Sequence, residues 1–136
     1  MDYQALVNSR NERNLFAKRV GALVTEISQG YARVEKTVEP DDANPVGVPH
    51  GGGDFTMADN ACGSAMATHG CMAVTVNASY NFFRSARVGD HLTAEAREVK
   101  TGRTVCVYDV RLTNQDDVLL GTGTFTFYKL DQKLEV

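Results

Sequence analysis

Two parts of the chain alternate apolar with polar side chains and predict β-strands. In the first part, residues 20–27 and 31–38 form two such runs around Gln29 and Gly30. Alternating runs joined by a short turn that contains glycine are typical of a β-hairpin. The first third of the chain is therefore expected to contribute two adjacent antiparallel strands.

The second part begins at residue 74 and predicts four more strands, separated by polar turns. The expected strands are residues 74–83, 92–97, 105–112 and 118–128. Alternation in the first of them predicts one continuous face made of Val74, Val76, Ala78, Tyr80 and Phe82. Gly121 and Gly123 share a face of the last strand, which indicates that another part of the backbone packs closely there.

Helical spacing appears between the two parts. From Phe55 to His69 the apolar positions recur three or four residues apart, and Gly70 follows as a candidate helix terminator. Most intervening residues are small, and small side chains let a helix lie close to another backbone. We therefore expect a central helix embraced by the sheet, entered through a proline-rich loop over residues 39–49.

A shorter helix is predicted over residues 3–17, which are polar and poor in strand-forming side chains. Leu6, Leu15 and Phe16 are its main apolar positions, and we expect them to anchor it to the rest of the protein.

The elements follow the order helix, two strands, central helix, four strands. Strands joined by hairpins form an antiparallel sheet, and a lone helix must cover its apolar face. The predicted class is therefore α+β. A length of 136 residues is that of one domain, so residues 1–136 are expected to fold together.

Charge and cysteine content narrow the range of functions. A formal net charge of −3 argues against a general nucleic-acid binder. The three cysteines form no C-x-x-C pair and lie among apolar neighbours, so we expect buried, reduced thiols. The first residues lack the basic and apolar segments of a secretory signal, and no long apolar run follows. We therefore expect a cytoplasmic protein that contacts neither membranes nor nucleic acid.

Residues 44–61 are the stretch best suited to chemistry. A loop passes through Gly51, Gly52 and Gly53 into the central helix, whose second turn is expected to carry Asp59. A helix start stripped of side chains presents free N–H groups and the positive end of the helix dipole, which suit a carbonyl or an oxyanion. A flexible glycine turn and a solvated aspartate on the helix flank explain the same residues, and both interpretations stay open at this point.

Other kinds of site fit the sequence poorly. The glycines match neither a P-loop, which needs a following lysine, nor a dinucleotide-binding fingerprint placed after a strand. Ser64 does not lie in a G-x-S-x-G motif, and Ser64, His69 and Asp59 occupy positions of one helix that cannot converge. No histidine or carboxylate pair has the spacing of metal ligands. We expect no metal and no cofactor.

Taken together, Asn44, five residues, His50-Gly51-Gly52, six residues and Asp59 form a pattern. On this order of elements it resembles the hotdog-fold thioesterases of the phenylacetate-pathway and human thioesterase-superfamily-2 type. Residues 82–90 also look like that family's strand end and turn. The resemblance covers nearly the whole chain.

The resemblance implies a curved antiparallel sheet of five to six strands wrapped around one long helix. It further implies subunits joined edge to edge into dimers or dimers of dimers, with the active site at the interface. The substrate would be an acyl thioester of coenzyme A. By the same resemblance, the N–H of Gly51 would polarise the thioester carbonyl, and Asp59 would be the nucleophile or the general base toward water.

The resemblance also assigns supporting roles. Asn44 would help to position the carbonyl or the water, His50 would shape the loop, and Thr75 would hold the attacking water. Substrate contacts are expected from Gly52 and from four basic residues that could hold the coenzyme A phosphates: Arg84, Arg87, Lys100 and Arg103. Solvated charges in turns are the alternative explanation for these basic residues.

The chain departs from the family pattern at one place, and other functions of the same fold have to be considered. Gly53 and Asp54 stand where members of the family more often place an apolar residue, and Asp54 is expected either to cap the helix or to alter acyl preference. A protein of the same fold that binds or senses acyl-CoA without hydrolysing it is the alternative function. The surroundings of His50 and Asp59 fit a hotdog dehydratase less well.

Overall fold

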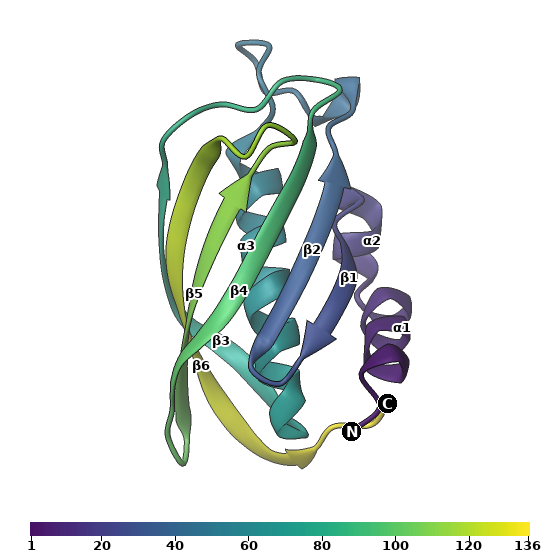
Figure 1. The fold of residues 1–136 in the computed structure, drawn as a ribbon, viewed down its shortest axis with the longest axis vertical. Helices are drawn as coiled ribbons and strands as arrows, with labels where there is room; N and C mark the ends of the chain where they lie inside the picture. The colour runs from purple at the N-terminus through teal and green to yellow at the C-terminus, as the bar shows by residue number, and fades with distance from the viewer.

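Six antiparallel strands form one curved sheet, and the longest helix lies across its concave face (Figure 1). The computed structural model describes residues 1–136. The strand order along the sheet is β1-β2-β4-β5-β6-β3. This arrangement is the hotdog fold, and it confirms the predicted class. The strands are β1 Leu23–Ser28, β2 Tyr31–Thr37, β3 Cys71–Phe82, β4 His91–Thr101, β5 Val105–Thr113 and β6 Leu119–Lys133.

The central helix α3 (Gly51–Met66) begins directly at the glycines. His50 is its N-cap, and the Nδ1 atom of His50 accepts a hydrogen bond from the N–H of Gly52 at 2.7 Å. Asp54, considered as a cap from the sequence, lies inside the first turn instead. The buried side chains of the helix are mostly small, which lets α3 approach the sheet closely. They include Ala58, Ala61, Cys62 and Ala65.

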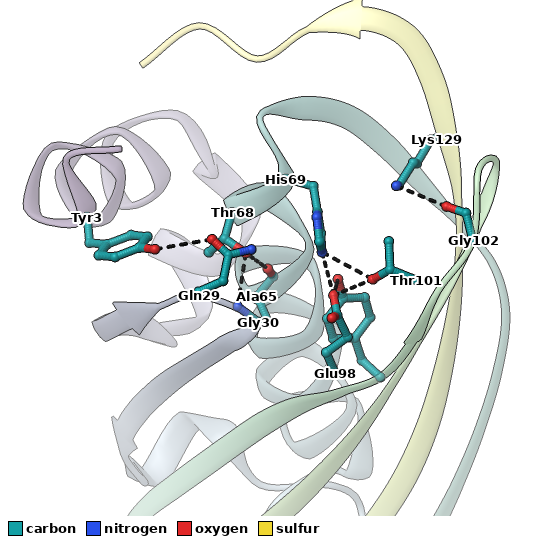
Figure 2. A network of polar contacts seen from close by, with 11 residues as sticks. Tyr3, Gln29, Gly30, Ala65, Thr68, His69, Glu98, Thr101, Gly102 and Lys129 are labelled. Atoms are coloured by element: carbon teal, nitrogen blue, oxygen red, sulfur yellow. Dashed lines mark hydrogen bonds and ion pairs between the residues drawn. The ribbon is translucent and has the colours of Figure 1, made fainter.

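Polar contacts fasten the far end of this helix to the sheet (Figure 2). The helix continues as one 3-10 turn (η2, Ala67–His69), and Gly70 ends it with φ +75°, as predicted. Thr68 Oγ1 accepts a hydrogen bond from the N–H of Gly30 at 3.1 Å, in the turn between β1 and β2. His69 Nε2 pairs with the carboxylate of Glu98 on β4. Burial raises the pKa of Glu98, but its hydrogen bonds bring that pKa below its ordinary value. The donors are Thr101, His69 and Tyr108.

The N-terminal segment forms two helices rather than the single helix predicted. They are α1 (Tyr3–Arg13) and α2 (Leu15–Val20), and Asn14 both ends the first and caps the second. Leu6 is buried, as expected. Leu15 and Phe16 were predicted to be anchors, but their exposed fractions are 69% and 60% because the new helix start at Asn14 turns them toward solvent.

Asn11 of α1 covers the outer edge of β1. Its Oδ1 accepts a hydrogen bond from the N–H of Val24 at 2.8 Å, and its Nδ2 donates to the carbonyl of Val24, also at 2.8 Å. The amide of Asn11 thus makes the pair of contacts that the backbone of another strand would make.

A bulge in β3 changes which of its residues face the helix. Pairing with β6 shifts register between Thr75 and Asn77, so the alternation reverses there. Val74 and Val76 are consequently exposed, whereas Ala78 packs against the core and Thr75 reaches α3. The predicted continuous face of this strand was wrong, because strict alternation in a sequence does not reveal an inserted residue.

Gly121 and Gly123 of β6 leave room for β3. A Cβ atom at Gly123 would lie 2.8 Å from the ring of Tyr80 and 2.9 Å from the carbonyl oxygen of Ser79. The close approach predicted from these glycines is confirmed.

No helix of the structure combines the length and the apolar character needed to cross a bilayer.

Candidate active site

Asp59 lies at the wall of a cavity between α3 and β3. It belongs to the third turn of the helix, not the second, because α3 starts at Gly51. The Oγ1 atom of Thr75 donates a hydrogen bond to Asp59 Oδ1 at 2.8 Å. Both side chains line a cavity of about 210 Å³, together with Arg10 and Met72. The structure therefore joins two of the predicted catalytic residues.

A polar network that the sequence did not reveal lies behind Asp59. Arg10 Nε donates to Ser64 Oγ at 3.0 Å, and a terminal nitrogen of Arg10 donates to Asn60 Oδ1 at 3.3 Å. Burial lowers the pKa of Arg10, and the negative charge of Asp59 acts in the opposite direction. The spacing of Asn60 and Ser64, one turn apart, was the only available signal, since nothing in the sequence connects either residue with Arg10.

Gly51 lines a second cavity at the start of the helix. This cavity has a volume of about 330 Å³ and is walled by Phe82, Phe83 and the loop that follows β3. The N–H of Gly51 has no acceptor within the chain, whereas those of Gly52 and Gly53 are bonded to His50. Of the three glycines, Gly51 therefore offers a free donor to a ligand.

His50 and Asn44 shape the approach to Gly51. The side-chain oxygen of Asn44 accepts hydrogen bonds from the N–H of Val46 at 3.0 Å and of Val48 at 3.2 Å. Asn44 thus holds the loop in a turn while lining the same cavity as Gly51. Because the amide oxygen is bonded within the loop, the amide nitrogen is the group of Asn44 that remains for a ligand.

The Asp59 cavity and the Gly51 cavity are separate on one chain. They share no lining residue. Asp59 lies eight positions after Gly51 on the helix, which corresponds to about 12 Å along the axis. A thioester carbonyl at Gly51 therefore cannot meet Asp59 of the same chain. Each cavity holds half of the predicted machinery.

The four basic residues predicted to contact phosphates lie in two places. Arg84 and Arg87 belong to the loop before β4, while Lys100 and Arg103 lie at the opposite end of that strand. A strand of this length spans about 36 Å. Of the four, Arg84 lines the Gly51 cavity.

The two cavities offer complementary chemistry. A carboxylate held by a hydroxyl can take a proton from water or attack a carbonyl. A free N–H at a helix start can stabilise the negative charge that develops on the carbonyl oxygen. No group of three or more His, Cys, Asp or Glu side chains gathers in a way that could hold a metal ion.

Sequence comparisons identify relatives of the chain. Residues 46–120 match the model of a family described as the thioesterase superfamily. Acyl-coenzyme A thioesterase PaaI of Escherichia coli is 34% identical over 104 residues, which are 76% of this chain and 74% of that protein. Human acyl-coenzyme A thioesterase 13 is 28% identical over 116 residues, 82% of this chain and 79% of its own.

Solved structures agree with these relatives. The PaaI protein of Escherichia coli, from a phenylacetic acid degradation operon, has a TM-score of 0.92 at 26% identity, covering 97% of this chain and 96% of its own. A Streptococcus mutans protein bound to acetyl-CoA has a TM-score of 0.78 at 32% identity, covering 82% of this chain and 90% of its own. The predicted family is confirmed: the chain is an enzyme of the thioesterase superfamily.

Proposed function

We propose that this chain hydrolyses acyl thioesters of coenzyme A at a site shared between two copies. The observation that carries the proposal is the division of the machinery on one chain. The carboxylate of Asp59 is held by Thr75 in one cavity, and the free N–H of Gly51 lies in another. A second copy is needed to bring the two groups onto one carbonyl.

Strand β3 supplies the edge along which two copies could join. It is an outer strand of twelve residues and pairs only with β6, so its other edge is unpaired. Unpaired edges of this length readily accept another strand. Met72, Val74 and Val76 on this strand are 42%, 47% and 57% exposed, and their apolar surface would be covered in such a dimer.

The two ends of β3 match the two half-sites. Thr75 lies next to Asp59, and Phe82 lies next to Gly51, where a Cβ would be 3.0 Å from the Phe82 ring. Antiparallel pairing of two β3 strands about a twofold axis between residues 78 and 79 sets Thr75 opposite Phe82 of the second copy. The Asp59 cavity of one copy would then face the Gly51 cavity of the other.

In this shared site the reaction needs little besides polarisation and a base. The thioester carbonyl accepts a hydrogen bond from the N–H of Gly51 of one copy. Asp59 of the other copy takes a proton from water or attacks the carbonyl itself. Either route adds one water in total, breaks the carbon–sulfur bond and releases a carboxylic acid and the protonated thiol of coenzyme A. Thr75 holds the carboxylate in the required orientation.

The relatives support coenzyme A as the carrier of the acyl group. Two of them are named acyl-coenzyme A thioesterases, and the Streptococcus mutans structure contains acetyl-CoA. Arg84 at the Gly51 cavity is the cation best placed to meet the phosphates.

The decisive experiment mixes two inactive variants. Asp59→Ala removes the carboxylate, and Gly51→Val fills the helix start. If each site takes one residue from each copy, exchange of subunits yields mixed dimers with one intact site. Thiol release from a panel of acyl-CoAs should then recover to about a quarter of the wild-type rate.

Two outcomes would contradict the proposal. A mixture that stays inactive after verified subunit exchange would exclude a shared site. Thermal stabilisation of the wild type by acyl-CoAs without thiol release would favour the alternative function, binding without hydrolysis.

A further inference from the structure

A second carboxylate on α3 lies in surroundings unlike those of Asp59. Asp54 is only 8% exposed, in the first turn of the helix. No donor within the chain forms a hydrogen bond or an ion pair with its side chain, and burial raises the pKa of Asp54 to about 6. Buried carboxylates are normally paired, but no group of this chain pairs with Asp54, so its oxygens are open to water or to a ligand.

The Gly51 cavity is the open side of Asp54. The side chain of Asp54 lines that cavity together with Phe82 and Phe83. Helical side chains lean toward the N-terminus, and residues three apart lie on the same face about 5–6 Å from each other. Asp54 and Gly51 therefore share one cavity, in which the thioester carbonyl is proposed to bind.

Tyr80 adds a second polar group without a partner. Its hydroxyl is buried and forms no hydrogen bond. The ring of Tyr80 packs edge-on against Phe82, with centroids 4.6 Å apart, and against Phe55 at 6.4 Å. Burial raises the pKa of Tyr80, and the charge of Asp54 raises it further, so the two groups are electrostatically coupled. The hydroxyl of Tyr80 lies beside Gly121 of β6 and does not line the Gly51 cavity, so of the two groups it is Asp54 that faces the cavity.

Such surroundings would affect apolar and hydroxylated acyl groups differently. A purely apolar acyl group would displace water from Asp54 and leave a charge buried without a partner. An acyl group with a hydroxyl at the right place would donate a hydrogen bond to the carboxylate and restore the lost contact. Sites built around such a hydrogen bond reject the analogue that lacks the donor.

We propose that Asp54 is a specificity-determining residue that accepts a hydrogen bond from the acyl group, so that the preferred substrates are hydroxyacyl thioesters whose hydroxyl lies a few bonds from the carbonyl. The inference rests on the proposed function and names the substrate class of the same site. Asp54 does not touch the reacting atoms in this scheme.

The test compares thioesters that differ by one hydroxyl. Suitable pairs are butyryl-CoA with β-hydroxybutyryl-CoA and benzoyl-CoA with meta-hydroxybenzoyl-CoA. The wild type should favour the hydroxylated member of at least one pair by about 10- to 100-fold in kcat/KM, the range for a hydrogen bond to a charged group. Asp54→Leu should remove or invert this preference. Asp54→Asn, which keeps the shape and an acceptor oxygen, should lower it severalfold and serves if the leucine variant does not fold.

Asp41→Ala is the matched control, because Asp41 is an exposed carboxylate outside the cavity. It should keep the wild-type preference. Equal rates on both members of each pair, or a preference unchanged in both Asp54 variants, would overturn the inference while leaving the thioesterase activity established.

A binding measurement separates the two proposals. In the Asp59→Asn background, the hydroxylated thioester should raise the melting temperature more than its partner, and Asp54→Leu should abolish the difference. If the wild type hydrolyses no thioester, the proposed function fails, and this difference alone decides the role of Asp54. No difference in stabilisation would then overturn the inference as well.

Discussion

The Asp59 cavity and the Gly51 cavity are each lined by a carboxylate from α3, but the two carboxylates differ in exposure and in hydrogen bonding. Asp59 is partly exposed and receives a hydrogen bond from Thr75. Asp54 is buried without a donor in the cavity that Phe82 and Phe83 also line, and burial raises its pKa to about 6. One helix thus carries a carboxylate that is held in place and another that has no partner.

In the two proposals above, Asp59 takes part in the reaction and Asp54 selects the acyl group. A catalytic carboxylate must be held in one orientation, and the hydrogen bond from Thr75 holds Asp59 in this way. A carboxylate that discriminates between ligands must instead lack a partner in the free protein, so that a ligand gains by supplying one. The comparison can be tested at each residue.

The largest effect is expected at Asp59. Asp59→Asn keeps the shape of the side chain but removes the base or nucleophile, so acyl-CoA hydrolysis should fall by about 10²–10⁴. Steady-state thiol release measures the loss, and thermal melting should change little because the residue is partly exposed. Activity within a fewfold of wild type would remove Asp59 from the mechanism.

The second largest loss of activity is expected for a substitution of Gly51, at the start of α3. In Gly51→Val the new side chain would meet the ring of Phe82, since a Cβ there would already lie only 3.0 Å away. We expect a fall in kcat of about 10²–10³, as for loss of one oxyanion donor. Gly53→Ala is the matched control, because a Cβ at Gly53 meets nothing within 4 Å. An equal loss in both variants would point to damage of the helix rather than of the donor.

The burial of Asp54 should make the free energy of unfolding depend on pH. Its pKa is raised from 3.8 to about 6 in the folded protein. The folded state then holds the proton more tightly than the unfolded state, so stability falls as pH rises from about 4 to about 6. Asp54→Asn should be more stable than wild type by about 1–3 kcal/mol near pH 7, and the gain should vanish near pH 4.

Urea unfolding of both proteins across this pH range measures the gain at Asp54. Asp41→Asn, at an exposed position, should follow the wild type. A gain for Asp54→Asn that is independent of pH would mean that the folded protein does not perturb this carboxyl.

The smallest effect is expected for Arg84, which is proposed to contact the phosphates of coenzyme A. Arg84→Ala should raise KM for acyl-CoA about two- to fivefold, in keeping with an exposed ion pair, and the effect should shrink at high salt. Arg103→Ala, at the other end of β4, should leave KM unchanged. The reverse result would place the phosphates at the β4–β5 turn.

Much of the fold could be predicted from the sequence, because alternation and helical spacing are local signals. The hairpin, the central helix and the later strands follow from them, and the glycines of β6 indicated close packing correctly. Local signals failed where a single residue changed the outcome. Asn14 divided the first helix, and a bulge after Thr75 reversed the faces of β3.

The candidate site was predictable only in part for a similar reason. The interval from Asn44 to Asp59 lies within one continuous stretch, so its pattern could be recognised. The contact of Asp59 with Thr75 crosses sixteen residues, and the contact of Arg10 with Ser64 crosses fifty-four. Asp54 shares its cavity with Phe82 and Phe83 from the end of β3, and a linear sequence does not place these residues together.

The amide of Asn11 on β1 has a consequence for the size of any assembly. Because Asn11 occupies the backbone groups of Val24, another strand cannot pair with β1 at this residue. The outer edge of β3 is then the main unpaired edge of the sheet. A second copy that binds along β3 would cover this edge in both copies. If two copies pair along β3 as proposed, we expect growth along the sheet to stop at two copies. Asn11→Ala would expose the edge of β1 and leave the sheet with two unpaired edges. Copies that add strands at both edges can form open-ended polymers.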